Sequence, residues 1–351
     1  MRPRSYRTDG MNRHALLIGI YFLVLNCAVR AQERPHADYD STYYQVFPNS
    51  ITGRFYFSQK YTNFDVRSTK TSHSISYVPN TTFNMGVGAT YRNFTLNLAY
   101  GFGFLNPDRK RGKTRYLDLQ LHLYPRKWAI DVFNQFYNGY YLTPRGNQAP
   151  DKDSYYLRPD LRVILMGASA FRVINDKRFS YRAALIQNEW QKKSAGSVLL
   201  GGELFFSHTI ADSSFVPANL ASRYHPRKVD ELYFMEFGPG IGYAYTYVTP
   251  QRFFLSGSLT VNIGITFMNE VSSRNKLQQV SVDPNVLYRL VAGYSDGRWN
   301  ANVSWVNSRV TANGSGTGNY YVFNIGNYRL TLARRFDASK VFKKDAGNNQ
   351  P

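Results

Sequence analysis

Residues 84–104, NMGVGATYRNFTLNLAYGFGF, alternate between two kinds of side chain and decide the fold. From Met85 to Tyr91 the odd positions are apolar, whereas the even positions hold Asn, Gly and Thr. After a short turn, the even positions from Phe94 to Tyr100 are apolar and the odd positions are Thr, Asn and Ala. Because side chains two residues apart lie on the same face of a strand, this pattern predicts a β-hairpin. One face of the hairpin is apolar and aromatic, and the other is small and polar.

The same alternation recurs along the chain and predicts about 13 strands. Clear examples are residues 117–123, 128–133, 286–294 and 299–305, and a final run covers 320–336. Bacterial single-chain barrels have even strand numbers, so we expect 12–14 strands, with a short strand hidden in 209–231 or one false candidate. Short turns alternate with longer polar connections, as on the two rims of an outer-membrane barrel. The expected long connections are 105–113, 139–159, 190–196, 209–231, 268–283 and 309–319.

Composition narrows the class of protein. The 351 residues carry a net charge of +20, and a mean hydropathy of −0.42 excludes a polytopic helical membrane protein. One cysteine excludes intrachain disulfides and cysteine-based zinc sites. The polar strand faces hold mostly Asn, Gly, Ser, Thr and Gln instead of charged residues, which favours a barrel lumen over a solvent-exposed face. Tyr and Trp near the strand ends suit a membrane interface. A secreted soluble β-protein remains the alternative.

The N-terminal segment has the order of a secretory signal peptide. Arginines precede the apolar run 15–27, and Ala31 offers a small-residue cleavage site before Gln32. Cleavage near Ala31 would remove Cys27, whereas a lipoprotein would be acylated at Cys27. The predicted organisation is a signal peptide (1–31), a periplasmic lead-in (32–48), a single transmembrane barrel (49–336) and a polar tail (337–351). The signal and the barrel pattern also make nucleic acid an unsuitable partner for the positive charge.

Three stretches carry a family resemblance. Residues 84–104, SYRAALIQNEWQKKSAGSVLLGGELFF (180–206) and FGPGIGYAYTYV (237–248) together resemble an uncharacterised barrel family of Bacteroidetes, classed as a domain of unknown function. The resemblance covers most of the mature chain. It implies the outer membrane of a Gram-negative cell and assigns no catalytic residue. Barrel-assembly machinery is then an expected partner for insertion.

Histidines are the weak candidates for catalysis. His122 lies on the polar face of its strand with Asp118, and Asp131 shares its hairpin, so the three could form a cluster in the lumen. Hydrogen bonding that fills the barrel is the favoured interpretation of this cluster. His208 is a second weak candidate, near Glu203. The sequence has no metal-ligand spacing such as HExxH, and we expect neither a metal nor a cofactor.

Two groups of charged residues are candidates for ligand binding. A basic connection could pair with phosphates of outer-membrane lipids, lipopolysaccharide among them, or serve only as an anchor. Its residues are Arg109, Lys110, Arg111, Lys113 and Arg115. A second polar segment, residues 188–196, is either a rim that binds a ligand or a solvated loop. Its candidate contacts are Glu189, Lys192 and Lys193.

The function expected from these observations is that of a non-enzymatic outer-membrane barrel. It is either a narrow channel or a structural, surface-interacting barrel, because 12–14 strands lie between filled barrels and wide porins. Four charged side chains would narrow or select a channel if they point inward: Asp118, Arg172, Arg182 and Arg289. A lipid-modifying barrel enzyme with a His-centred site is the alternative.

Overall fold

The computed structural model describes residues 39–338, except residues 70, 92–93, 107–109, 225–227, 273–274 and 315–317. The chain divides into a unit of residues 1–39 and a unit of residues 40–351, and the fold described below belongs to the second. The predicted signal peptide, Cys27, Arg109 and most of the predicted tail lie outside the described residues.

The described residues are almost entirely strand, as the alternation predicts. The strands are β1 (Tyr44–Val46), β2 (Ser50–Ser68), β3 (Thr71–Val78), β4 (Asn84–Tyr91), β5 (Phe94–Tyr100), β6 (Arg115–Leu123), β7 (Trp128–Thr143), β8 (Leu157–Val173), β9 (Glu189–Gln191), β10 (Ala195–Ile210), β11 (Val229–Val248), β12 (Phe253–Ser272), β13 (Asn275–Ser295), β14 (Trp299–Asn313) and β15 (Asn319–Asp337). The helical elements are α2 (Tyr181–Leu185) and two 3₁₀ turns, Gly103–Leu105 and Ala218–Arg223.

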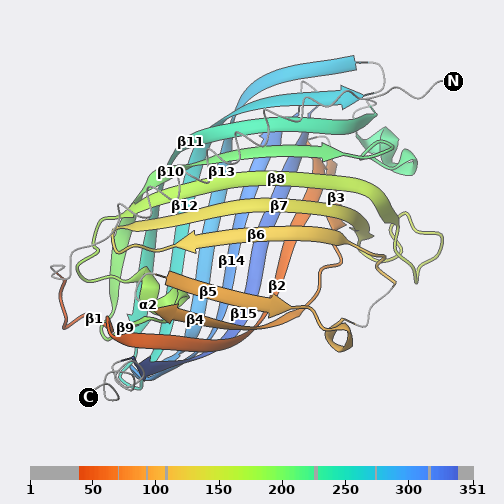
Figure 1. The fold of residues 1–351 in the computed structure, drawn as a ribbon. Helices are drawn as coiled ribbons and strands as arrows, with labels where there is room; N and C mark the ends of the chain where they lie inside the picture. The colour runs from red at the N-terminus through yellow and green to blue at the C-terminus, as the bar shows by residue number, and fades with distance from the viewer. Residues whose placement is uncertain are drawn as a thin grey trace, which may run out of the picture. The chain divides into compact units, whose positions relative to one another are not determined.

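The strands close into an antiparallel barrel (Figure 1). Among the described residues, one sheet contains thirteen strands, and ten of them form the closed ring β2-β3-β7-β8-β10-β11-β12-β13-β14-β15. β15 pairs with β2 over the whole length of both strands and completes the circle. The predicted fold class is therefore confirmed. The predicted 12–14 strands match the whole sheet but not the ring, because β4, β5 and β6 extend the wall over only part of its height.

Beyond the end of β3, its two neighbours β2 and β7 pair with different strands. The far half of β2 pairs with β3, whereas residues 51–58 of β2 pair with β4, which in turn pairs with β5. On the other side, β7 pairs with β3 through residues 141–143 and with β6 through residues 130–138. β5 and β6 are consecutive in the chain, yet no backbone pairing joins them in the described part. We call the interval between these two strands the seam.

The two ends of the barrel differ in their connections. The turn end holds the short turns 124–127, 249–252 and 296–298, and the loop end holds the connections 144–156 and 211–228. The expected division into two rims is incomplete, because β12 and β13 continue through most of the expected loop 268–283. In 211–228 the described residues contain no strand, only a 3₁₀ turn. The turn end also carries a long connection, 174–194, which we call the plug.

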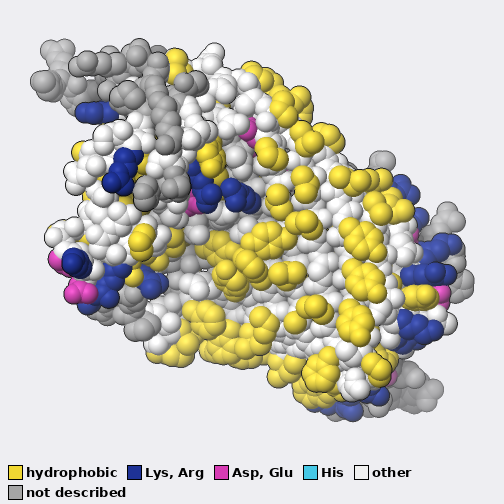
Figure 2. All heavy atoms as spheres, turned by 180° about the vertical axis from the view of Figure 1, so that it is seen from behind, with side chains coloured by type: hydrophobic (Ala, Val, Ile, Leu, Met, Phe, Trp, Pro, Cys, Tyr) yellow, Lys and Arg dark blue, Asp and Glu magenta, His cyan; other side chains and the backbone are white. Residues whose placement is uncertain are grey.

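The outer face of the barrel is apolar over its middle. Figure 2 shows hydrophobic side chains spread over this face, with basic side chains gathered toward both ends. No helix of the described residues is long and apolar enough to cross a membrane. Aromatic residues lie near the turn end, where Trp128 and Trp299 are outward and exposed. Exposed apolar side chains include Leu96, Leu98, Leu119, Ile241, Leu255, Ile263, Val303, Leu330 and Leu332.

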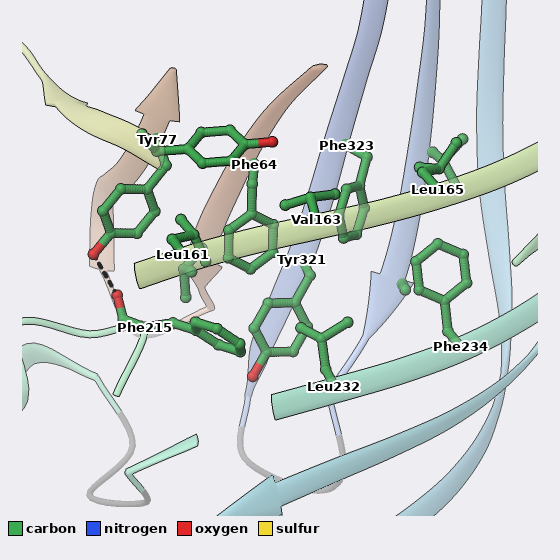
Figure 3. Close-up of a cluster of buried hydrophobic side chains, with 14 of the residues drawn as sticks. Phe64, Tyr77, Leu161, Val163, Leu165, Phe215, Leu232, Phe234, Tyr321 and Phe323 are labelled. Atoms are coloured by element: carbon green, nitrogen blue, oxygen red, sulfur yellow. Dashed lines mark hydrogen bonds between the residues drawn. The ribbon is translucent and has the colours of Figure 1, made fainter. Parts of the chain in front are cut away.

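The loop end of the lumen is a packed apolar core. Figure 3 shows Phe64, Val163, Leu232 and Phe323 converging from different strands of the wall. Phe215, from the connection 211–228, inserts among them, and its carbonyl accepts a hydrogen bond of 2.7 Å from the Tyr77 hydroxyl. A connection that returns into the lumen thus helps to close this end of the barrel.

The plug closes the turn end. Ser180 caps α2 through its hydroxyl, which accepts a hydrogen bond from the Ala183 backbone N–H. The helix buries Tyr181 against Tyr124, with ring centroids 5.8 Å apart. β9 of the plug pairs with β1 from the lead-in. The sequence shows no helical periodicity here because α2 is a single short turn packed inside the ring.

Candidate functional site

One polar cluster in the lumen surrounds Asp131 on β7. His122 lies opposite Asp131 in the β6–β7 register, and its Nδ1 is 2.6 Å from Asp131 Oδ1. The Tyr124 hydroxyl donates to the same oxygen at 3.1 Å, and Arg289 from β13 pairs with Oδ2. The predicted His122–Asp131 neighbourhood is therefore present. Arg289 is fully buried, and its pairing with Asp131 spans the lumen.

This cluster lacks the geometry of a nucleophilic triad. The Ser169 hydroxyl donates to Asp131 Oδ2 at 3.4 Å and has no hydrogen bond to His122 in the described structure. A triad requires the hydroxyl to contact the imidazole, because the imidazole accepts its proton. The His122 side chain nevertheless remains 29% exposed, against 1% for Asp131. Its ring is thus reachable although it points inward.

Asp118 lies in a separate network. It accepts hydrogen bonds from Gln135 at 3.2 Å and from the Tyr137 hydroxyl at 2.7 Å. Lys60 of β2 forms an ion pair with it at 3.2 Å. Because β2 carries β4 and β5 on one side of the seam and β6 forms the other edge, this ion pair links the two sides of the wall within the lumen.

His208 points outward. It lies on β10 next to the exposed Phe206, and its Nε2 is 2.9 Å from Glu231 Oε1. The Tyr233 ring stacks on it at 4.0 Å between centroids, and the Tyr233 hydroxyl donates to the same carboxylate. Glu203, its neighbour in sequence, points into the lumen instead. The outward His208 cluster is thus unconnected to His122.

Sequence reasoning missed a pair of buried carboxylates. Glu203 on β10 and Glu236 on β11 each accept a hydrogen bond from the Asn285 amide, at 2.7 and 2.6 Å. Gly264 leaves room for this arrangement, because a Cβ there would meet the Glu236 carboxylate. Both glutamates are buried on inward positions of their strands, and only the strand register brings them to the same asparagine.

Sequence reasoning also missed a stripe of inward arginines on β2 and β15: Arg54, Arg329 and Arg335. Arg54 donates to Thr90 Oγ1 at 2.6 Å, to Asn97 Oδ1 at 3.2 Å and to the Ile186 carbonyl of the plug at 2.7 Å. Arg335 donates to the Glu189 carbonyl at 2.7 Å. The Arg329 guanidinium lies 4.3 Å from the Tyr56 ring centroid. The small residues of β4 make room for this stripe, since a Cβ at Gly88 would contact Arg54.

The predicted polar segment around Glu189 is part of the plug. Glu189 is buried, accepts a hydrogen bond from the Ser180 hydroxyl at 2.5 Å and pairs with Arg182 at 3.2 Å. It therefore differs from the exposed rim contact that the sequence suggested. Lys192 is half-buried and Lys193 is exposed, with its amine 5.7 Å from the Tyr43 ring centroid. Arg172, expected to narrow a channel if inward, is exposed on the outer face of β8.

The basic connection before β6 borders a groove on the outer face. The groove has a volume of about 370 Å³ and lies where the outward residues of β2, β14 and β15 change from apolar to polar. Tyr61 lines the groove. Its hydroxyl accepts a hydrogen bond from Trp305 Nε1 and donates one to Asn307, both at 2.9 Å. Arg111 lines the groove, whereas Lys110, Lys113 and Arg115 are exposed outside it.

The described residues contain no cluster of His, Cys, Asp or Glu that could hold a metal ion. The inward polar groups described above include an acidic layer around Asn285 and a basic layer around the plug. Both lie behind an outer surface suited to lipid.

These features define the chain as an antiparallel β-barrel protein with a membrane-type outer surface. It belongs to the family described as "Domain of unknown function (DUF4421)", which matches residues 38–336. No match is found among curated proteins.

Solved barrels with low similarity include three outer-membrane or transport proteins. The outer membrane protease OmpT from Escherichia coli is 9% identical with a TM-score of 0.38, covering 83% of this chain and 98% of that one. OmpT of Vibrio cholerae is 9% identical with a TM-score of 0.28, covering 83% and 100%. The Pseudomonas putida toluene transporter TodX is 5% identical with a TM-score of 0.24, covering 82% and 90%. These likenesses are too weak to carry an argument about function.

Proposed function

We propose that this chain is a non-conducting, non-enzymatic barrel of a Gram-negative outer membrane that works through contacts with membrane lipids. The filled lumen carries the proposal. Apolar side chains and Phe215 pack the loop end, and the plug occupies the turn end. A narrow channel would need a continuous polar path, whereas Phe64, Val163 and Phe323 are buried against one another across the loop end.

The outer surface supports the membrane location. Lipid-facing barrels carry an apolar band bordered by aromatic residues. Trp128 and Trp299 border the band at the turn end, and Tyr61, Trp305 and Tyr328 border it toward the loop end. The sequence supplies a signal for export, and barrel-assembly machinery would insert the mature chain. With the short turns in the periplasm, the loop end faces the cell exterior.

Conductance in a planar bilayer tests the filled lumen. We expect the refolded mature chain to insert, as judged by protease protection, without a reproducible open conductance. A variant lacking residues 179–193 should also stay closed, because the apolar core seals the loop end independently. A stable, salt-dependent open conductance of the unmodified chain would contradict the proposal.

The groove at Arg111 is the proposed lipid contact on the outer face. Its mixture of aromatic rings, amides and one guanidinium suits a phosphorylated sugar headgroup, such as that of lipopolysaccharide. We expect Arg111→Gln to weaken binding of purified lipopolysaccharide several-fold. Lys110→Gln is the matched control, since Lys110 carries the same charge in the same connection but does not line the groove. An equal loss of lipopolysaccharide binding in both variants would mean that the positive charge of the connection, not the groove, binds the lipid.

A lipid-modifying enzyme is the second candidate function, favoured by one observation. His122 is oriented by Asp131 and keeps an accessible ring, which is the arrangement of a general base acting on water. The test is the lipid profile of cells expressing His122→Ala. A change in lipid A or phospholipid composition, with normal amounts of folded barrel, would favour catalysis over the non-enzymatic function.

A further inference from the structure

Two lumenal arginines at the turn end lack a charged partner. Arg54 is 6% exposed, and its hydrogen bonds go to a hydroxyl, an amide oxygen and a backbone carbonyl, all neutral. Arg329 stacks on Tyr56. Within the part of the chain that the structure describes, neither arginine forms an ion pair, and the Nε atom of each is buried without a hydrogen-bond partner. Two other lumenal cations are paired, Arg289 with Asp131 and Lys60 with Asp118. Arg335 also has no ion pair among the described residues, but it donates to the Glu189 carbonyl of the plug.

Arg54 is buried and Arg329 is half-buried, and guanidinium groups withdrawn from water in this way favour an anion. Removing a charge from water costs several kcal/mol unless an opposite charge and hydrogen bonds compensate. The two arginines also repel each other, since both project from the same side of the β2–β15 pair. Phosphate suits them, because its oxygens match the planar fork of guanidinium N–H groups.

The seam lies beside Arg54, and Arg329 follows it on the neighbouring strand β15 across β2. Arg54 bonds directly to Asn97 on β5, the strand that forms one edge of the seam. Asn97 and Ala99 occupy inward positions of β5 and are nevertheless exposed. On the opposite edge, inward His122 of β6 also keeps 29% of its side chain accessible. The inner surfaces on both edges are therefore reachable, unlike those of the paired strands around the ring.

The outer faces of the same two strands are apolar. Leu96 and Leu98 of β5, and Leu119 and Leu121 of β6, are all exposed and outward. Unpaired strand edges are unfavourable in hydrocarbon, because their N–H and C=O groups lack partners there. The seam thus combines an apolar exterior, polar edges and a cationic interior within one wall.

We propose that the seam admits the phosphate headgroup of an anionic membrane lipid to Arg54 and Arg329, with its acyl chains against the outer faces of β5 and β6. The headgroup supplies the missing opposite charge and acceptors for the unpaired Nε atoms. The apolar strand faces select a lipid over free phosphate. The site is distinct from the groove at Arg111, and it rests on the membrane location proposed above.

Binding by the refolded chain in maltoside micelles tests the site, and this measurement does not depend on membrane insertion. The probes are short-chain phosphatidylglycerol, the uncharged diacylglycerol of the same chain length and inorganic phosphate. We expect binding of phosphatidylglycerol only. Tight binding of inorganic phosphate would show that free phosphate is the ligand and overturn the role of the seam. Binding of none, or equal binding of both lipids, would overturn the site itself.

Variants locate the binding. Arg54→Gln with Arg329→Gln should weaken phosphatidylglycerol binding about 10-fold or more, because both substitutions remove charge-assisted hydrogen bonds to the phosphate. Arg172→Gln removes the same charge from the outer face of β8 and should leave binding unchanged. Equal weakening by Arg172→Gln would contradict the site. Heat-modifiable gel mobility confirms that each variant is folded.

A labelling experiment keeps the seam testable if the arginine variants fail to fold. Ala99→Cys places a thiol on the inward side of β5, and Ala301→Cys places one on the outer face of β14. Phosphatidylglycerol should slow maleimide labelling at position 99 several-fold and leave position 301 unaffected. Equal effects at both positions, or no protection at position 99, would overturn entry through the seam.

Discussion

The two ends of the lumen are closed by different interactions, mainly apolar packing at one end and a larger share of polar and charged contacts at the other. At the loop end, rings and aliphatic side chains such as Phe64, Val163 and Phe323 pack around the inserted Phe215. At the turn end, the plug packs Phe179 and Tyr181 into a smaller apolar cluster. Wall arginines also donate hydrogen bonds to its carbonyls, and Tyr181 lies beside the buried Arg289. The loop end therefore relies mainly on apolar packing, with a few hydrogen bonds to the connection 211–228. The turn end adds a charged pair, Arg289 with Asp131, that is buried inside the ring.

This difference predicts different responses to substitution. Removing an apolar side chain loses transfer free energy and leaves a cavity. Removing one member of a buried ion pair leaves an uncompensated charge, which is more disruptive because the remaining group has no alternative partner. Removing a charge or binding a charged ligand should therefore change the stability of the barrel more at the turn end than at the loop end. Four substitutions test this comparison, and urea unfolding in micelles followed by tryptophan fluorescence measures each.

Asp131→Ala should have the largest effect. It leaves Arg289 buried without its carboxylate and removes the acceptor for Tyr124 and His122. We expect the free energy of unfolding to fall by about 4 kcal/mol, in the range for broken buried ion pairs. The double variant Asp131→Leu with Arg289→Met should recover part of this loss. If the double variant is no more stable than Asp131→Ala, unpaired charge is not the cause.

Phe64→Ala should have the next largest effect. Phe64 is fully buried and lies within ring-stacking distance of Tyr77, Tyr321, Phe215 and Phe323. We expect a loss of about 3 kcal/mol in the free energy of unfolding, from lost burial and the resulting cavity. Phe64→Leu is the control and should lose less than half as much. A loss from Phe64→Ala greater than that from Asp131→Ala would reverse the comparison between the two ends.

The sequence predicted the barrel because apolar residues alternate with polar ones, and this alternation shows which face of each strand is apolar. It placed His122, Asp118 and Asp131 inward correctly, since their positions follow from parity alone. It also placed Arg289 among the possible inward charges. Whether a residue falls on an odd or an even position can be read from the strand's own sequence, so these assignments need no information from other strands.

Other features depend on contacts between distant segments and have no local signal. The Arg54–Ile186 hydrogen bond joins β2 to the plug, and the Glu203–Asn285 bond joins β10 to β13. Residues 268–283 read as a loop because their polar residues interrupt the alternation, yet pairing between β12 and β13 extends the hairpin. The seam is likewise invisible in the sequence, since β5 and β6 each alternate like fully paired strands.

Tyr77→Phe should have a smaller effect, confined to the loop end. It removes the hydroxyl that donates to the Phe215 carbonyl and leaves that buried acceptor unpaired. We expect a loss of about 1–2 kcal/mol and faster proteolysis in the connection 211–228. Tyr140→Phe is the matched control, because the buried Tyr140 hydroxyl has no hydrogen-bond partner in the described structure. Similar losses for both variants would mean that the space filled by the hydroxyl, not its hydrogen bond to Phe215, accounts for the loss.

Asp296→Asn should have the smallest effect, and its pH dependence separates the two ends. Asp296 Oδ1 accepts the backbone N–H groups of Arg298 at 2.9 Å and Trp299 at 2.7 Å in a turn-end connection. Burial opposes ionisation, but these donors and the nearby arginines Arg252 and Arg335 hold the pKa of Asp296 below its usual value.

A carboxylate with a lowered folded-state pKa stabilises the fold above the unfolded-state pKa, which is about 4 for Asp, and this stabilisation is lost as the pH falls through the folded-state pKa. Asn keeps an oxygen acceptor but carries no charge. The difference between the unmodified chain and Asp296→Asn should therefore be about 1 kcal/mol or less at pH 7 and should shrink below pH 4. The loss caused by Tyr77→Phe should stay the same at both pH values, because no titrating group takes part in that hydrogen bond. A pH-independent effect of Asp296→Asn would show that the turn end, like the loop end, is held without a contribution from this charge.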